Sequence, residues 1–175
     1  AKSSGARLID VRNPPTNLPV GTGIKRSGKR VLMVGTDCAI GKKYAALALH
    51  KAMCEAGMKA SFRATGQTGI MLAGEGIPID SVVADFIAGA AELISPANDE
   101  DHWDIIEGQG SIFHPGYSGV SLGLLHGSQP DAFVICHDAT RTLVSGWEHF
   151  TLPSIHEAID LHAQLGRRTN PEIRC

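Results

Sequence analysis

Val31-Leu-Met-Val-Gly-Thr-Asp-Cys-Ala-Ile-Gly-Lys-Lys43 is the stretch that decides the fold of this chain. It begins as a short apolar run, passes through a glycine-containing turn and ends in Gly41-Lys42, and an Ala- and Leu-rich helical segment follows at once. This order of strand, loop and helix is typical of a phosphate-binding loop, because loop amides, the positive end of the helix and a lysine all attract an anion. The sequence therefore predicts a site for a phosphorylated ligand at one end of a parallel sheet.

The loop departs from the common pattern Gly-x-x-x-x-Gly-Lys-Ser/Thr at two points. Five residues separate Gly35 from Gly41, so Thr36 occupies the position of the leading glycine, and position 43 is lysine where a hydroxyl normally binds Mg²⁺. Lys43 cannot bind a metal while it is protonated, so we expect a phosphate site that requires no metal. The residues expected to bind the cofactor are Thr36, Asp37, Cys38, Ala39, Ile40, Gly41, Lys42 and Lys43. We interpret Cys38 mainly as a packing residue of this loop.

Composition sets limits on the class of protein. The chain has 175 residues, 43% of them hydrophobic, and a net charge of −2, so it can build one sizeable core and has no broad attraction for nucleic acid or membrane surfaces. None of the four cysteines forms a Cys-x-x-Cys pair, which argues against a zinc site and for a reducing compartment. We expect a cytoplasmic homo-oligomer with a small-molecule substrate and neither nucleic acid nor membrane as a partner.

Apolar runs alternate with helical patterns along the chain, which predicts an α/β protein: a three-layer, P-loop NTPase-like fold with a mainly parallel sheet. The expected strands are 31–34, 60–64, 105–107 and 132–136, with a further strand-like run at 7–11. The expected helices are 42–56, 80–94 with Asp80 as N-cap, 121–126, and a last one to about 165 that opens with a Ser154/Glu157 capping box. Residues 70–78 read as irregular. Residues 1–30 read as a linker, or as the remnant of a preceding domain, and 31–175 as the P-loop domain.

Polar loops, most of them rich in glycine, follow all four main strands, at 35–41, 65–69, 108–111 and 137–141. Ligands of parallel sheets bind at the carboxyl ends of the strands. The four loops therefore predict one composite site.

Several side chains in or near these loops are candidates for chemistry. Glu107 ends a strand and either lies near the phosphates, where it binds a metal directly or through water, or is satisfied by backbone amides of neighbouring loops. Asp37 either faces a substrate amine or a metal, or braces its own loop. His114 is a possible general base, because its unperturbed pKa is near 6.5, or else a structural loop residue. The residues expected to bind substrate are Arg63, Thr65, Gln67 and Gln109.

Two of these segments resemble loops of dethiobiotin synthetase: 35–42 is similar to its Gly-Thr-Asp-Thr loop and 106–111 to its Glu-Gly-x-Gly loop. A closer resemblance covers nearly the whole chain, through the strings at 35–43, 63–70, 80–93, 106–111 and 114–127. On these strings the chain resembles the D-glutamate N-acetyltransferases, a bacterial family once known only as a domain of unknown function.

The resemblance implies a two-domain protein in which a Rossmann-like N-terminal domain precedes the P-loop domain and acts as its partner. It implies transfer of acetyl from acetyl-CoA to the amino group of D-glutamate, by direct attack of the amine after a general base has removed a proton. Glu107, Asp37 and His114 are the candidate bases, and the N-terminal domain is a further source. Two other functions stay open: an ATP- and Mg²⁺-dependent ligase or kinase similar to dethiobiotin synthetase, and a non-catalytic nucleotide-binding domain.

Overall fold

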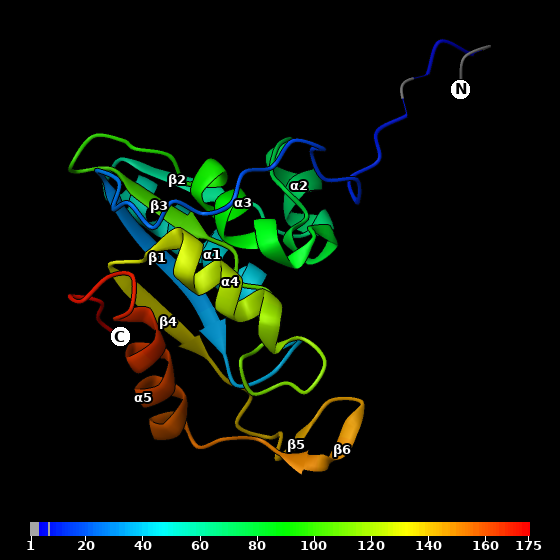
Figure 1. The fold of residues 1–175 in the computed structure, drawn as a ribbon, viewed down its shortest axis with the longest axis vertical. Helices are drawn as coiled ribbons and strands as arrows, with labels where there is room; N and C mark the ends of the chain where they lie inside the picture. Colours follow the sequence, from blue (N-terminus) through cyan, green and yellow to red (C-terminus); the bar gives the residue numbers. More distant parts are fainter. Residues whose placement is uncertain (1–3, 7) are drawn as a thin grey trace.

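A computed structural model describes residues 4–6 and 8–175 of the chain. Its centre is a sheet of four parallel strands in the order β2-β3-β1-β4. The strands are β1 (Lys29–Gly35), β2 (Ala60–Arg63), β3 (Trp103–Ile106) and β4 (Ala132–Cys136) (Figure 1). The α/β fold with a parallel sheet is the one that the sequence predicts.

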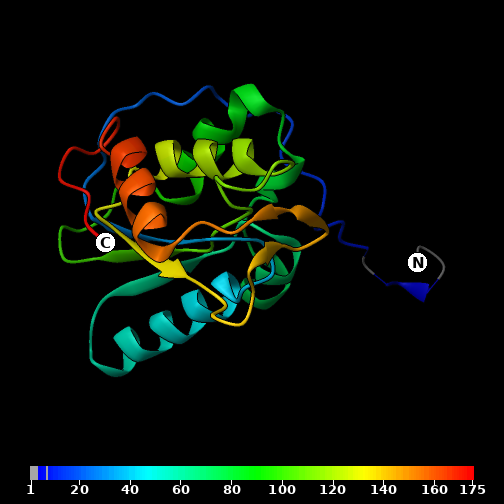
Figure 2. The same cartoon turned by 90° about the horizontal axis from the view of Figure 1, so that it is seen from below.

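Helices cover both faces of the sheet (Figure 2). One face packs against α1 (Lys42–Glu55), and the other packs against α3 (Ile87–Ile94), α4 (Ser118–Ser128) and α5 (Ile155–Gly166). Alternation along β1 serves both layers, because Val31 and Met33 face α1 whereas Leu32 and Val34 face the other helices. The result is three layers with two apolar cores.

The segment between β2 and α3 differs from the prediction. A short helix, α2 (Gln67–Ala73), begins before the stretch that reads as irregular. The helix expected from Asp80 begins only at Ile87, after 3₁₀ turns at Ile79–Ser81 and Ala84–Phe86. Asp80 caps nothing, because its carboxylate accepts a hydrogen bond from Arg12 instead.

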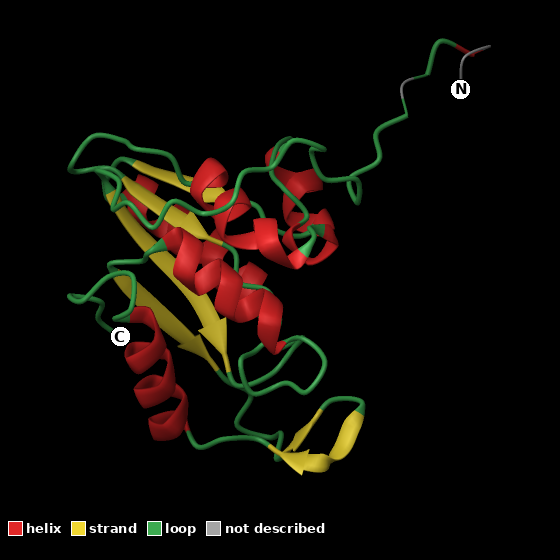
Figure 3. Cartoon of the chain, viewed as in Figure 1, coloured by secondary structure: helices red, strands yellow, loops and turns green. Residues whose placement is uncertain are grey.

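The prediction for α5 is confirmed. Ser154 Oγ accepts a hydrogen bond from the Glu157 amide (3.2 Å), and Glu157 Oε2 accepts one from the Ser154 amide (2.8 Å). Between β4 and α5 lies a hairpin that the sequence analysis does not predict, β5 (Leu143–Val144) with β6 (Trp147–Thr151), and it projects below the sheet in Figure 3.

No strand forms at 8–11, and residue 7, which begins that expected strand, lies outside the described residues. Residues 12–28, here called the N-terminal strap, lie against α3 and the end of α4 (Figure 1). Glu92 of α3 accepts hydrogen bonds from the Thr22 and Gly23 amides, at 2.9–3.0 Å. A Cβ at Gly89 would lie 1.9 Å from the Pro19 carbonyl oxygen, so strap and helix are in direct backbone contact. The strap is therefore packed on the domain up to the start of β1.

Within the described part of the chain, no helix is both long and apolar enough to cross a membrane.

Candidate functional site

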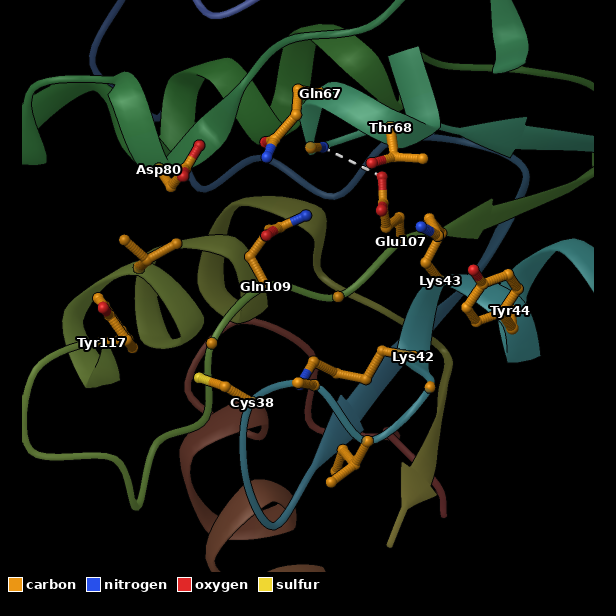
Figure 4. Close-up of a pocket in the computed structure, with 17 residues that line it drawn as sticks. Cys38, Lys42, Lys43, Tyr44, Gln67, Thr68, Asp80, Glu107, Gln109 and Tyr117 are labelled. Carbon is orange, nitrogen blue, oxygen red and sulfur yellow. Dashed lines mark hydrogen bonds between the residues drawn. The ribbon is translucent and has the colours of Figure 1, made fainter. Parts of the chain in front are cut away.

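The carboxyl ends of the strands open into a cavity of about 510 Å³ (Figure 4). Three of the four predicted loops meet there: the loop before α1, the loop before α2 and the loop after β3. The residues that line the cavity are Cys38, Ala39, Ile40, Gly41, Lys42, Lys43, Tyr44, Gly66, Gln67, Thr68, Asp80, Glu107, Gly108, Gln109, Gly110, Tyr117 and Val120.

One wall of the cavity consists of backbone N–H groups. In the described chain, no group accepts a hydrogen bond from the amides of residues 39–44, which form the end of the loop and the first turn of α1. Gly41 takes a left-handed conformation (φ 95°) that favours glycine, and this turns the chain from loop into helix. Free amides at a helix N-terminus, with a lysine beside them, form an anion cradle.

Lys42 adds its charge from within the loop. Its Nζ donates a hydrogen bond to the carbonyl oxygen of Asp37 (2.7 Å), and its side chain is buried. Burial lowers the pKa of Lys42, while nearby Cys38 and Asp37 oppose that change. An anion in the cradle would favour the charged ammonium.

Asp37 lies outside the cavity and is fully buried. Its Oδ1 accepts a hydrogen bond from the Cys38 amide (2.7 Å), and its Oδ2 accepts from Arg141 Nη1 and the Ser145 amide (both 2.9 Å). Burial acts to raise the pKa of Asp37, but the hydrogen bonds from Ser145, Arg141 and Cys38 outweigh it and hold the pKa below its ordinary value. The arrangement is that of an ionised brace which fixes the loop.

Glu107 lies just beyond β3 and faces the cavity with one oxygen free. Its Oε2 accepts hydrogen bonds from the amides of Thr65 (2.9 Å) and Gly66 (3.0 Å), whereas Oε1 makes none with the described residues. Burial raises the pKa of Glu107, although these amides and Lys43 act in the opposite direction. Glu107 is therefore a carboxylate held in one orientation, with more affinity for a proton than a surface glutamate.

The four residues expected to bind substrate separate into two groups. Gln67 and Gln109 line the cavity. Thr65 is buried behind the wall, where its hydroxyl donates to the Glu107 carbonyl oxygen (2.7 Å) and accepts from Gln109 Nε2 (3.0 Å). Arg63 points away from the cavity into an ion pair with Asp104 (2.7 Å).

Thr36, from the predicted cofactor set, also lies behind the cavity. It is buried, and its hydroxyl is 3.0 Å from His137 Nδ1. Of the other members of that set, Asp37 lies outside the cavity and residues 38–43 line it.

His114 is buried next to the loop but does not line the cavity. Its Nδ1 accepts a hydrogen bond from the Gly116 amide (3.0 Å), so the neutral ring carries its proton on Nε2 and offers a donor there instead of a base. Tyr117 stacks on the ring at 4.4 Å and Trp147 meets it edge-on at 4.6 Å between centroids.

Asp37, Cys38 and His114 are grouped closely enough to be tested as a metal site, since one ligand atom from each lies within 4.8 Å of the others. The guanidinium of Arg141 already binds the Asp37 carboxylate, however, and a second cation beside it would be repelled. This donor set fits a metal ion poorly.

Sequence reasoning missed three side chains that shape the site: Arg141, Asp80 and Tyr117. Arg141 could have been predicted, because it belongs to the expected loop 137–141 after β4. Asp80 was assigned to a helix start. Tyr117 gave no signal in the sequence, because its place beside the cavity depends on the packing of α4.

Residues 19–175 match the model of a family described as "Domain of unknown function (DUF1611_C) P-loop domain". The chain belongs to this family. A crystal structure of a DUF1611 family protein from Anabaena variabilis superposes on the chain with a TM-score of 0.85 at 42% identity, covering 91% of this chain and 47% of that one. The P-loop architecture built above is therefore that of the DUF1611 domain.

Two curated relatives carry the name "D-glutamate N-acetyltransferase". One, from Tritonibacter scottomollicae, is 51% identical over 174 residues, and the other, from a Pseudoalteromonas species, is 53% identical over 174 residues. Each match covers 99% of this DUF1611 chain and 52% of the relative. The chain thus spans about half the length of the curated relatives it matches.

Proposed function

We propose that this domain acts within a longer protein that transfers acetyl from acetyl-CoA to the amino group of D-glutamate, together with an N-terminal domain. One observation carries the proposal: a row of free amides and a buried carboxylate with one free oxygen belong to residues that line the same cavity. The names of the two curated relatives, and the chain's half-length match to them, support it.

The amide wall suits the diphosphate of CoA. Amides 39–44 lack acceptors, and Lys42 lies beside them, so an anionic group there gains several charge-assisted hydrogen bonds. Acyl transfer involves no γ-phosphate, so it does not depend on the metal-binding hydroxyl that Lys43 replaces.

In the proposed reaction, Glu107 Oε1 removes a proton from the substrate ammonium. The free amine then attacks the carbonyl carbon of the acetyl thioester, and the carbon–sulfur bond breaks. The CoA thiolate takes the proton held by Glu107, and the second proton lost from the nitrogen goes to solvent. We assign this role to Glu107 because it is the candidate base that lines the cavity and has a free oxygen. We assign Asp37 to bracing the loop and His114 to supporting it, because the oxygens of Asp37 are occupied and Nδ1 of His114 is engaged.

An ATP- and Mg²⁺-dependent ligase or kinase would use the same cradle, and a non-catalytic domain would bind nucleotide without turnover. Calorimetric titration with acetyl-CoA and with ATP, each with and without Mg²⁺, separates these functions. We expect acetyl-CoA to bind without metal. If ATP binds only in the presence of Mg²⁺ and acetyl-CoA does not bind at all, the proposal is overturned.

Activity is tested by thiol release from acetyl-CoA with the full-length protein and a panel of D- and L-amino acids. We expect release with D-glutamate and little with L-glutamate. If none of the amino acids in the panel causes thiol release, the proposed N-acetyltransferase activity is contradicted.

We further propose a cytoplasmic homo-oligomer. The compartment is supported by the supply of acetyl-CoA that such a reaction needs. The assembly is supported by exposed apolar side chains on α2 and between the two 3₁₀ turns that follow it, Met71, Leu72 and Val83, which are 62–66% exposed. Light scattering of the full-length protein measures the oligomeric state.

A further inference from the structure

An ion pair lies on the rim of the cavity, between the N-terminal strap and the wall opposite the cradle. Arg12 Nη1 donates to Asp80 Oδ2 (2.6 Å) and to Gln67 Oε1 (3.1 Å). Asp80 and Gln67 both line the cavity. The Arg12 and Asp80 side chains are 47% and 37% exposed, so ligands can reach both.

The framework fixes the place of Asp80 and holds the strap that carries Arg12. Next to Asp80, the fully buried Ile79 donates its amide to the Thr65 carbonyl oxygen (2.9 Å), which ties the turn to the end of β2. On the other side, the hydrogen bonds from Thr22 and Gly23 to Glu92 hold the strap against α3. The pair is therefore a feature of the folded domain.

The ion pair leaves most of its hydrogen-bonding capacity unused. Arginine and carboxylate commonly pair through two parallel hydrogen bonds, but here a single nitrogen makes both contacts of the guanidinium. Among the described residues, nothing pairs with Arg12 Nε or Nη2, or with Asp80 Oδ1. A donor fork and an acceptor oxygen are thus available side by side.

The pair also lies close to the proposed base. The negative charge of Asp80 contributes to raising the pKa of Glu107, so the two carboxylates face a common space. A group that carries a positive charge near Asp80 would therefore lie within the field of Glu107.

We propose that Arg12 and Asp80 form the seat of the amino acid acceptor: its α-carboxylate binds Arg12 and its α-ammonium binds Asp80, beside Glu107. This inference rests on the proposed function and names the substrate class of that site, an α-amino acid zwitterion. The α-ammonium and the α-carboxylate insert into an existing ion pair, so each of these two charges keeps an opposite partner. Arg12 and Asp80 act as positioning residues, and the strap thereby contributes directly to specificity.

The test uses the full-length protein and steady-state kinetics with D-glutamate, 4-aminobutyrate (which lacks the α-carboxylate) and D-2-aminobutyrate (which lacks the side-chain carboxylate). We expect Arg12→Gln to raise KM for D-glutamate and D-2-aminobutyrate about tenfold, as loss of a charge-assisted contact does. KM for acetyl-CoA should stay unchanged, and 4-aminobutyrate should react poorly and equally with both proteins. A variant that raises KM for 4-aminobutyrate as much as for D-glutamate would overturn the inference.

Two controls separate recognition from a purely structural ion pair. Arg168→Gln removes an exposed arginine whose side chain has no hydrogen bond or ion pair with the described residues, and should leave every KM unchanged. The exchange Arg12→Asp with Asp80→Arg restores the ion pair with its charges reversed. If the pair only holds the strap, the exchange restores KM; if it seats the zwitterion, KM for D-glutamate stays high while the melting temperature recovers.

Calorimetric titration of D-glutamate distinguishes this inference from the proposed function. If turnover and binding are unchanged in Arg12→Gln, the proposed seat is wrong and the proposed acetyltransferase activity is unaffected. Binding that depends on Arg12, without acetyl transfer, would support the seat and overturn the activity. Neither binding nor transfer in the wild-type protein would overturn both.

Discussion

At the scale of the residue, Glu107 shows how the surroundings give the two oxygens of one carboxylate different tasks. The amides of Thr65 and Gly66 hold Oε2, which fixes the orientation and leaves Oε1 facing the cavity. Burial raises the pKa in spite of those amides. A side chain with this environment suits the role of a general base.

We expect Glu107→Gln to lower kcat by about 10²–10⁴-fold, the usual contribution of a general base. In the wild-type protein, kcat/KM should rise with pH through the raised pKa of Glu107, because the base acts only when deprotonated. The variant should lose that rise. The measurement is the pH profile of kcat/KM for D-glutamate, with the exposed Glu172→Gln as a control that should keep the wild-type profile. An unaltered profile in Glu107→Gln would assign the base elsewhere.

Asp37 gives a stability prediction with a defined sign. Its pKa in the folded protein lies below the unfolded value of about 3.9, so its ionised form stabilises the fold above that pH, and this contribution is lost as the pH falls through the folded pKa. We expect Asp37→Asn to lower the free energy of unfolding by about 3 kcal/mol at pH 7, because Arg141 loses its buried partner. Urea denaturation measures the free energy of unfolding of both proteins, and the difference between wild type and variant should be smaller at pH 3 than at pH 7. An equal difference at the two pH values would refute the role of Asp37 as a brace.

At the scale of the element, local signals in the sequence decided which parts could be predicted. The apolar run of β1 followed by Gly41-Lys42, and the Ser154/Glu157 pair, act within a few residues of themselves, and β1, α1 and α5 formed as expected. The predicted helix start at Asp80 is wrong, because the Asp80 carboxylate pairs with Arg12, which lies 68 residues away in the sequence. The sequence does not predict the β5–β6 hairpin, because the hairpin meets the loop before α1 only in the folded chain.

The site shows the same division. The loop residues 38–43 and Glu107 follow directly from the strand–loop–helix pattern, and they line the cavity. The sequence left the roles of Asp37 and His114 open, because these depend on Arg141, Ser145 and the Gly116 amide, which only the folded chain brings together. The seat at Arg12 was invisible for a similar reason.

Helix α5 carries a buried titratable group that gives a second pH prediction. His162 is 1% exposed, and its Nδ1 lies 2.7 Å from the Ala158 carbonyl oxygen. Burial lowers the pKa of His162, so the unfolded chain binds a proton more readily, and stability falls as the pH drops below the unfolded pKa of about 6.5.

We expect His162→Leu to reduce this loss of stability between about pH 6.5 and pH 5, even if the variant is less stable at pH 7. Thermal melts at half-unit pH intervals measure the slope. Parallel curves for the wild-type protein and the variant would show that His162 is not responsible.

At the scale of the whole molecule, the N-terminal strap joins parts that the chain order separates. Its Arg26 donates hydrogen bonds to the carbonyl oxygens of Ser95 and Gly127, which lie at the ends of α3 and α4. The strap then leads directly into β1. It therefore links the helical layer, the sheet and, through Arg12, the rim of the cavity.

The close contact between strap and α3 predicts that Gly89→Ala displaces the strap. The added Cβ would lie 1.9 Å from the Pro19 carbonyl oxygen, so the free energy of unfolding should fall by about 1–3 kcal/mol. KM for D-glutamate should rise as well, because Arg12 moves with the strap. Gly119→Ala is the matched control: a Cβ there meets nothing within 4 Å, and this variant should be neutral or slightly more stable. Equal behaviour of the two variants in urea melts would contradict tight packing of the strap.

The bracing of Asp37 by Arg141 and Ser145 has a consequence for folding of the protein during its synthesis. The ribosome makes residue 37 more than a hundred residues before its two supports, so the nascent chain cannot complete the anion cradle until the hairpin has been synthesised and has docked. Under the proposed function, binding of acetyl-CoA is therefore among the last abilities that the folding domain acquires.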